Sequence, residues 1–285
     1  MEKNSKNQFI KSKISNSKIF NNKLFNNKIF NLIKSYFIKY IAIIIFIIVW
    51  QFLSITGFFD ENFVSSFTTT AYTMLYLIFN GIIIEDALYT FLRITIGVFL
   101  AILVAIPLGF LVAGFYKKLE ISINPLFRFL EQLNPFGFFH FIILLTLLNE
   151  LSIVLVIFWA ALWPLLNNTV SGARNIKEEY IKIAKASNFD NFDIFWKVQL
   201  RASLANIFTG LRLSVIFAFL AVFGVEMMGM TTGKGLGYFI MTSQMAGNVP
   251  YIWAGVVTVT LLSVFIIKII NQIEKYFVKE KIRAF

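Results

Sequence analysis

Two adjacent stretches of opposite character decide the fold of this chain. The first is the uncharged run LSIVLVIFWAALWPLLNNTVSGA (Leu151–Ala173), which is long enough to cross a bilayer as a helix of about 20 residues. The second is KEEYIKIAKASNFDNFDIFWKVQLRAS (Lys177–Ser203), which is too charged to cross, although its apolar residues recur at helical spacing. The sequence therefore predicts two short amphipathic helices that stay outside the membrane between two spans.

The composition is that of an all-α integral membrane protein. Hydrophobic residues make up 58% of the 285 residues and charged residues 14%, against roughly 45–50% and 25% in soluble domains. Uncharged windows predict six transmembrane helices, if the fifth is extended back to about Leu204 and the third begins near Ile121. We expect the third to be broken around Pro125 and Pro135, because proline disrupts helices. The windows are Tyr40–Phe59, Ile94–Tyr116, Gln132–Asn149, Leu151–Ala173, Leu213–Val225 and Gly235–Ile267.

Basic residues orient these spans. They cluster in residues 1–39 and after each even-numbered span, whereas none occurs from Tyr40 to Leu92. The positive-inside rule then predicts a multi-pass protein of the cell membrane with both termini in the cytoplasm. Residues 1–39 are interpreted as a basic low-complexity arm, and residues 40–285 as the membrane domain, with a cytoplasmic insert over about 174–203.

The net charge of +11 is interpreted as topology and as attraction to anionic lipid. No nucleic acid partner is expected, because no nucleic-acid-reading motif accompanies the lysines. The chain has no cysteine and His140 is its single histidine, so no metal site is expected. The stretch GMTTGKGLG (Gly229–Gly237) lacks the G-x-x-x-x-G-K-[ST] spacing of a phosphate loop and is expected to form a turn between the fifth and sixth spans.

Charged and amide side chains inside the predicted spans are candidates for a solute pathway. We expect Arg93, Arg128 and Glu131 to extend toward the headgroups rather than into the interior. Arg212 lies roughly 12 Å into its helix, so an interior role and a headgroup role are both open. The remaining candidates could serve either packing or transport. The possible pathway-lining residues are Asn167, Asn168, Arg212 and Glu226.

The insert is predicted to fold as a compact pair of helices, here called the knob (Lys177–Ser203). Its first helix should end near Asn188, a residue that tolerates the left-handed backbone conformation. Asp190 can cap the second helix, with Asp193 three residues later. The aromatic residues of the knob could anchor it to the membrane domain or meet a partner; they are Phe189, Phe192, Phe195 and Trp196.

The order of these elements resembles that of binding-protein-dependent ABC transporter permeases. The insert is followed by FWKVQLRASLANIFTGLRLS (Phe195–Ser214) and then by GVEMMGMTTGKGLGYFI (Gly224–Ile240), and the similarity covers roughly Glu85–Lys275. It is strongest to the subgroup that imports nitrate, sulfonate, taurine, bicarbonate and vitamin precursors. The family's Glu-Ala-Ala reads Lys182-Ile183-Ala184 here, its glycine falls on Asn188, and a usual proline falls on Arg201.

The resemblance implies the fold and partners of a type I ABC importer permease. The expected partners are an ABC ATPase subunit, an extracytoplasmic solute-binding protein, a second permease copy in a homodimer, and the lipid membrane. This chain would bind no cofactor, since ATP and Mg would lie on the ATPase, and it would not itself be an enzyme. The knob would supply a coupling helix that docks on the ATPase through Glu179, Lys182, Ile183, Ala184, Ser187, Asn188 and Phe189.

A secondary carrier or channel that works alone is the alternative. Inverted repeats and broken helices with paired charges inside the membrane would favour it. The spans show no clear internal repeat. A membrane-bound enzyme is a more distant alternative, because no cluster of His, Cys or carboxylate residues converges in the sequence.

Overall fold

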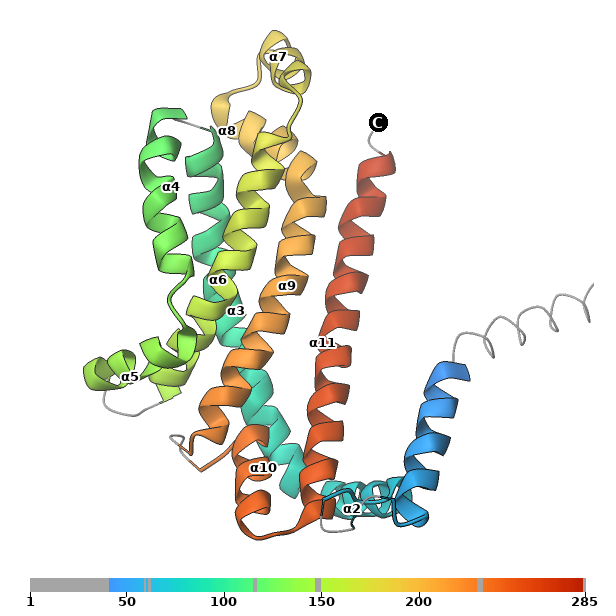
Figure 1. Ribbon diagram of the computed structural model, residues 1–285. Coiled ribbons are helices and arrows are strands. Elements are labelled where there is room, and N and C mark those ends of the chain that lie inside the picture. The colour runs from blue at the N-terminus through green and yellow to red at the C-terminus, as the bar shows by residue number, and fades with distance from the viewer. Residues whose placement is uncertain are drawn as a thin grey trace, which may run out of the picture. The chain divides into compact units, whose positions relative to one another are not determined.

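The computed structural model describes residues 41–58, 60, 63–114, 117–146, 150–229 and 233–283, with the backbone alone for 114, 117–121 and 278–283. The predicted basic arm, residues 1–39, lies outside the described residues. All regular elements of the described chain are helical (Figure 1). They are a helix over Ile41–Ile55, α2 (Phe67–Phe79), α3 (Ile82–Gly114), α4 (Lys117–Glu131), α5 (Pro135–Thr146), α6 (Glu150–Arg174), α7 (Glu178–Ala186), α8 (Asn191–Asp193), the π-helix η1 (Ile194–Gln199), α9 (Leu200–Met227), α10 (Leu236–Met245) and α11 (Val249–Arg283).

The chain divides into two units, residues 1–68 and 69–285. In the first unit, the helix Ile41–Ile55 is tied to the segment that leads into α2. The Trp50 indole N–H donates to the Ser65 carbonyl at 3.1 Å, and the Gln51 side-chain oxygen accepts the Thr68 amide at 3.1 Å. The Trp50 and Phe67 rings also pack edge to face, with their centroids 5.6 Å apart. These contacts fix the turn that follows the first helix.

In the second unit, α6 is the central helix and lies between α3 and α9 (Figure 1). Small residues allow its close approach to both neighbours, as is common between membrane helices. A Cβ atom on Gly97 of α3 would lie 2.5 Å from the Ile157 side chain of α6. A Cβ atom on Gly210 of α9 would lie 2.7 Å from the Asn168 Cβ. Packing at these glycines forms a core in which Val156, Ile157 and Leu165 of α6 are fully buried.

The six predicted spans are confirmed only in part among the described residues. Among the described residues, four helices are long and apolar enough to cross a membrane: Ile82–Ala113, Glu150–Arg174, Asn191–Met227 and Val249–Phe277. A fifth is obtained only if Ser122–Glu131 and Pro135–Thr146, which are bent by 90°, form one broken span. The helices Ile41–Ile55 and Phe67–Phe79 are apolar but shorter.

The boundaries differ from the sequence windows for local reasons. The predicted break in the third span occurs at 132–134, directly before Pro135, whereas Pro125 lies inside α4. The sixth window is divided into α10 and α11 by a turn at 246–248, where Gly247 has φ +66°. The second span begins at Ile82 instead of Ile94, so that Arg93 lies inside the helix.

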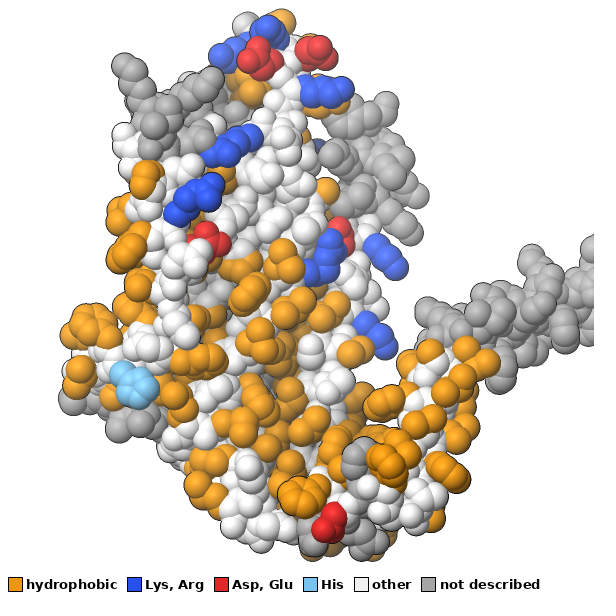
Figure 2. Space-filling view, in the orientation of Figure 1, with side chains coloured by type: hydrophobic (Ala, Val, Ile, Leu, Met, Phe, Trp, Pro, Cys, Tyr) orange, Lys and Arg blue, Asp and Glu red, His pale blue; other side chains and the backbone are white. Residues whose placement is uncertain are grey.

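The visible face of the molecule separates charge from apolar surface along the bundle (Figure 2). Lysine, arginine and acidic side chains gather over α7, whereas hydrophobic side chains cover α5 and the lower part of α9. We call the end of the bundle that carries α7 the knob end. The opposite end, where α9 turns into α10, is called the turn end (Figure 1). This distribution is typical of a protein whose apolar middle faces lipid.

Candidate functional site

The knob forms as predicted at its first helix. α7 covers Glu178–Ala186, and Asn188 has φ +58°, the left-handed conformation expected of it. The Asn188 amide donates to the Lys185 carbonyl at 3.1 Å, and the Phe189 amide to the Ala184 carbonyl at 3.1 Å. This pair of bonds is the Schellman arrangement that satisfies the last carbonyls of a helix. Asn188 thus takes the place that glycine usually fills.

The second half of the knob differs from the prediction. Asp190 has the extended backbone of a helix cap, but its side chain makes no capping hydrogen bond. Asp193 pairs with Lys197 at 2.9 Å instead of with the helix start. α8 and η1 then run directly into α9, so the second amphipathic helix is the beginning of a membrane span. The knob is therefore continuous with α9.

The apolar residues of the knob divide into two sets. Ile194 and Ala184 are buried, and the Phe195 ring packs edge to face on Phe110 of α3 with centroids 5.0 Å apart. The exposed set contains large apolar side chains that the described chain covers only in part. Its members and exposures are Tyr180 (46%), Ile183 (63%), Phe189 (39%), Phe192 (72%) and Trp196 (50%).

The predicted docking residues include both exposed and buried residues of the knob. Ile183 and Phe189 belong to the exposed apolar set, and Glu179, Lys182, Ser187 and Asn188 are also exposed. Ala184, which was expected to pack against a partner, is 5% exposed within the chain itself. The small alanine side chain allows α7 to pack on η1, so its surface is already used inside the knob.

An ion-pair network lies at the turn end, and it is buried except at Glu150, whose side chain is 43% exposed. The Arg93 Nε and Nη2 atoms donate to the two carboxylate oxygens of Glu150 at 2.7 and 2.6 Å. The Arg93 Nη1 atom donates to Glu226 Oε1 at 2.7 Å and to the Lys234 carbonyl at 2.8 Å. Arg93 is 2% exposed and Glu226 0%. The expectation that Arg93 extends toward the headgroups is wrong, because two carboxylates satisfy its guanidinium inside the bundle.

The same network caps the start of α10. Successive amides of Gly235, Leu236 and Gly237 donate to Asp86 Oδ1, Thr90 Oγ1 and Glu226 Oε2, each at 2.9 Å. The Thr90 hydroxyl lies 3.0 Å from both Glu226 oxygens. The first amides of a helix have no partner within the helix, so these side chains supply what the backbone cannot. Asp86, Thr90 and Arg93 can act together because they lie on one stripe of α3.

The described part of the glycine-rich stretch, Gly229 and residues 233–237, leads from α9 into α10 and has a further role in packing. A Cβ atom on Gly235, which has φ +124°, would lie 2.4 Å from Glu226 Oε1. At the surface of the same turn, the Lys234 ammonium lies 3.0 Å from Glu85 Oε1, and this hydrogen bond raises the pKa of Lys234. Because Gly235 has no Cβ atom, its backbone can approach the buried Glu226 carboxylate. Spacing alone gave no sign of Glu150 or Arg93 as members of this site.

The four possible pathway-lining residues occupy four different environments. Glu226 is enclosed in the network, where its carboxylate accepts hydrogen bonds from Thr90, Arg93 and the Gly237 amide. Arg212 pairs with Glu274 of α11 and also donates to Asn271 Oδ1 at 3.4 Å. The Asn168 amide donates to the Pro164 carbonyl of its own helix at 2.8 Å. Asn167 lines a pocket.

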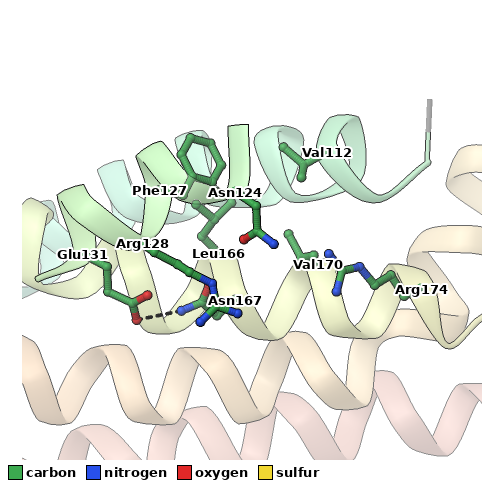
Figure 3. Close-up of a pocket in the computed structure, with 9 residues that line it drawn as sticks. All are labelled: Val112, Asn124, Phe127, Arg128, Glu131, Leu166, Asn167, Val170 and Arg174. Carbon is green, nitrogen blue, oxygen red and sulfur yellow. Dashed lines mark hydrogen bonds between the residues drawn. The ribbon is translucent and has the colours of Figure 1, made fainter. Parts of the chain in front are cut away.

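That pocket lies between α4 and α6 (Figure 3). It has a volume of about 170 Å³ and holds the side chains of Arg128 and Glu131, both exposed. The Asn167 amide donates to Glu131 Oε1 at 2.8 Å across the two helices. The remaining lining residues are Val112, Asn124, Phe127, Leu166, Val170 and Arg174. Among the described residues, no group of three or more His, Cys, Asp or Glu side chains could hold a metal ion.

Comparison with known proteins places these features in a family. Residues 105–283 match the family described as "Binding-protein-dependent transport system inner membrane component". The bicarbonate transport system permease of Synechocystis sp. is 30% identical over 203 residues, covering 68% of this chain and 72% of that protein.

Two further relatives are named for other solutes. The nitrate import permease of Leptolyngbya laminosa is 28% identical over 174 residues, covering 61% of each chain. A Bacillus subtilis protein, named as a candidate permease for aliphatic sulfonates, is 26% identical over 235 residues, which cover 82% of this chain and 84% of the relative. The match thus spans much, but not all, of these proteins.

Proposed function

Because this chain belongs to the binding-protein-dependent transport system inner membrane components, in the subgroup of nitrate, sulfonate and bicarbonate permeases, we propose that it forms the translocation pathway of an ATP-driven importer and couples that pathway to a separate ATPase. In this proposal the chain completes six spans, with the knob end in the cytoplasm. Two copies surround the pathway, and an extracytoplasmic binding protein delivers the solute at the turn end.

The exposed apolar surface of the knob is the observation that carries this proposal. Large apolar side chains grouped on a charged, water-facing element are typical of a surface that binds another protein. Ile183, Phe192 and Trp196 are all at least half exposed. We propose that this surface docks in a groove of the ATPase subunit, with the charged residues Glu179 and Lys182 at the rim.

The connections of the knob provide a route for coupling. α7 follows directly after α6, and η1 continues into α9, so a displacement of the knob acts on two helices of the central bundle. The contact between Phe195 and Phe110 adds α3 as a third. Closure of two ATPase subunits on ATP would then move the knobs and switch the pathway between outward and inward access.

We further propose that the imported solute is a small anion. The relatives described above are named for bicarbonate, nitrate and aliphatic sulfonates, which are all anions. ATP and Mg would be bound by the ATPase, so this chain would contribute no nucleotide site.

Co-expression with the cognate ATPase tests the function. Affinity purification of this chain should recover the ATPase together with two copies of the permease, and the chain alone should hydrolyse no ATP above an empty-membrane control. A permease that moves solute across liposomes without the ATPase would instead favour the stand-alone carrier.

A further inference from the structure

The pocket between α4 and α6 combines more positive than negative groups. Arg128 and Arg174 contribute two guanidinium groups, whereas Glu131 contributes one carboxylate. That carboxylate already accepts the Asn167 amide at 2.8 Å. Within the described part of the chain, Arg128 has no hydrogen bond or ion pair, and Figure 3 shows its side chain reaching from α4 toward Asn167 on α6. Arg128 is therefore a guanidinium at this pocket whose donors the described groups leave available to a ligand.

The charged lining is arranged in two facing stripes. Asn124, Arg128 and Glu131 follow one another at helical spacing along α4. Asn167, Val170 and Arg174 do the same along α6. Residues separated by three, four or seven positions share one face of a helix, so both helices turn these side chains toward the same space.

The depth of the pocket decides what the stripes face. Asn167 precedes the last residue of α6 by about 10 Å along a helix of 25 residues. A guanidinium at that depth is costly in hydrocarbon and is found where it faces water or a protein partner. Arg128 and Glu131 are nevertheless exposed on the chain. The α4–α6 face is therefore better suited to a water-filled pathway than to lipid.

The size of the pocket limits what it can hold. Its volume of about 170 Å³ lies below the roughly 300–1,000 Å³ of sites for drug-sized ligands. It is several times the volume that one molecule occupies in liquid water, about 30 Å³. A planar guanidinium with amide donors beside it fits the oxygens of a carboxylate or similar oxyanion. Phe127 and Leu166 supply an apolar wall that limits competition from water.

We propose that this pocket is an anion-binding station on the knob-end half of the pathway, with Arg128 as its principal ligand and Asn124 and Asn167 as additional donors. Glu131 limits the net charge, so that a bound anion is not held too tightly to leave. The proposal rests on the proposed function, because it assigns the pocket to the translocation pathway of the permease.

A single engineered cysteine can report on the charge of the pocket. The native chain contains no cysteine, and Val170 lines the pocket one turn from both Asn167 and Arg174. The permease–ATPase complex carrying Val170→Cys is placed in liposomes and treated with an anionic methanethiosulfonate that carries an ethylsulfonate group, or with its cationic trimethylammonium counterpart. We expect the anionic reagent to react faster. Adding Arg128→Gln should lower the anionic-to-cationic rate ratio by roughly threefold or more, since a unit charge acts over a few ångströms.

Matched variants separate binding from general effects. Arg201→Gln removes the same charge from an exposed position outside the pocket and should leave the ratio unchanged. Arg128→Lys should retain much of the preference, and Glu131→Gln should raise it. Replacing gluconate by nitrate or bicarbonate at constant ionic strength should protect Val170→Cys, and the protection should disappear with Arg128→Gln.

Changing the lipid composition of the liposomes tests whether the bound anion is a lipid headgroup or a free solute. If a phosphate headgroup fills the pocket, added phosphatidylglycerol should slow the anionic reagent relative to phosphatidylcholine alone, and nitrate should give no protection. That result would overturn the pathway station. Equal rates for the two reagents, or an unchanged ratio with Arg128→Gln, would overturn it as well. Recovery of the ATPase with each variant is measured separately, so the anion station can fail while the importer function stands.

Discussion

The guanidinium of Arg93 donates to the carboxylate of Glu226 at 2.7 Å, although the two residues lie on different helices and are both almost fully buried. This ion pair joins α3 to α9, and through Glu150 it also reaches α6. The turn before α10 is bonded to the same groups. The turn end of the bundle is thus held by polar bonds, whereas the middle is held by small residues and apolar packing.

The first prediction concerns this ion pair. Arg93→Met leaves the Glu226 carboxylate buried without its cation, and breaking a buried pair in this way costs about 3–5 kcal/mol of folding free energy. We expect a clearly lower melting temperature in detergent. The double variant Arg93→Met/Glu226→Met should melt above Arg93→Met alone, because no uncompensated charge remains at position 226. If Arg93→Met had the same melting temperature as the wild type, the pair would contribute nothing to stability.

The second prediction concerns the turn. Gly235→Ala would place a Cβ atom 2.4 Å from Glu226 Oε1 in a backbone conformation with φ +124°. Gly233→Ala is the matched control, because it has φ +83° but no described atom within 4 Å of the new Cβ. Both variants also carry backbone strain of about 1–3 kcal/mol, and it is greater at Gly235, because φ +124° with ψ 153° is a conformation that almost only glycine adopts. The melting temperature should fall further for Gly235→Ala, and equal losses would contradict a role of close approach at this glycine.

The third prediction tests the knob as a docking surface. Ile183 is 63% exposed, so Ile183→Asp should leave the fold intact and abolish co-purification of the ATPase. Ala184→Asp is expected to lower the stability of the knob itself, because its side chain is buried within the chain. Lys182→Glu should be tolerated, since the pair with Glu178 at 3.5 Å is largely exposed and contributes about 0–1 kcal/mol. Full ATPase recovery with Ile183→Asp, at equal membrane levels, would remove the knob as the docking site.

The fourth prediction concerns the end of α7. Asn188 has φ +58°, which a β-branched side chain adopts at a cost of about 1–2 kcal/mol. Asn188→Val should therefore loosen the knob and weaken ATPase association, whereas Asn188→Gly should match the native protein. Pull-down of the ATPase and limited proteolysis of the knob measure the two effects. A valine variant with native association would show that the Schellman turn is not needed for docking.

The fifth prediction concerns orientation. A cysteine at Asp60 should react with an impermeant thiol reagent in intact cells, whereas one at Lys185 should react only after the membrane is opened. The cysteine-free native chain provides the background. Labelling at Lys185 from outside would reverse the proposed topology and exclude ATPase docking at the knob.

The sequence by itself determined the membrane class, the family and the position of the knob. Runs such as Leu151–Ala173 determine the membrane class and the position of the knob, because apolar length and charge act along the chain and need no knowledge of neighbours. The family follows from the resemblance of the ordered stretches Phe195–Ser214 and Gly224–Ile240. The left-handed turn at Asn188 was predictable for the same reason, since it depends on a local backbone preference. The six-span count was not fully confirmed, because the bend before Pro135 and the turn at Gly247 interrupt windows that look continuous in sequence.

Only the tertiary structure decided which polar residues meet. Arg93 and Glu226 are separated by more than a hundred residues, and no spacing rule links them to Glu150 or to the amides before α10. The burial of Ala184 and the facing stripes that bring Arg128 beside Asn167 likewise depend on how helices pack. Helix packing is set by side-chain shape across several elements at once, so a charge that seems fit for the headgroups can instead be buried and paired.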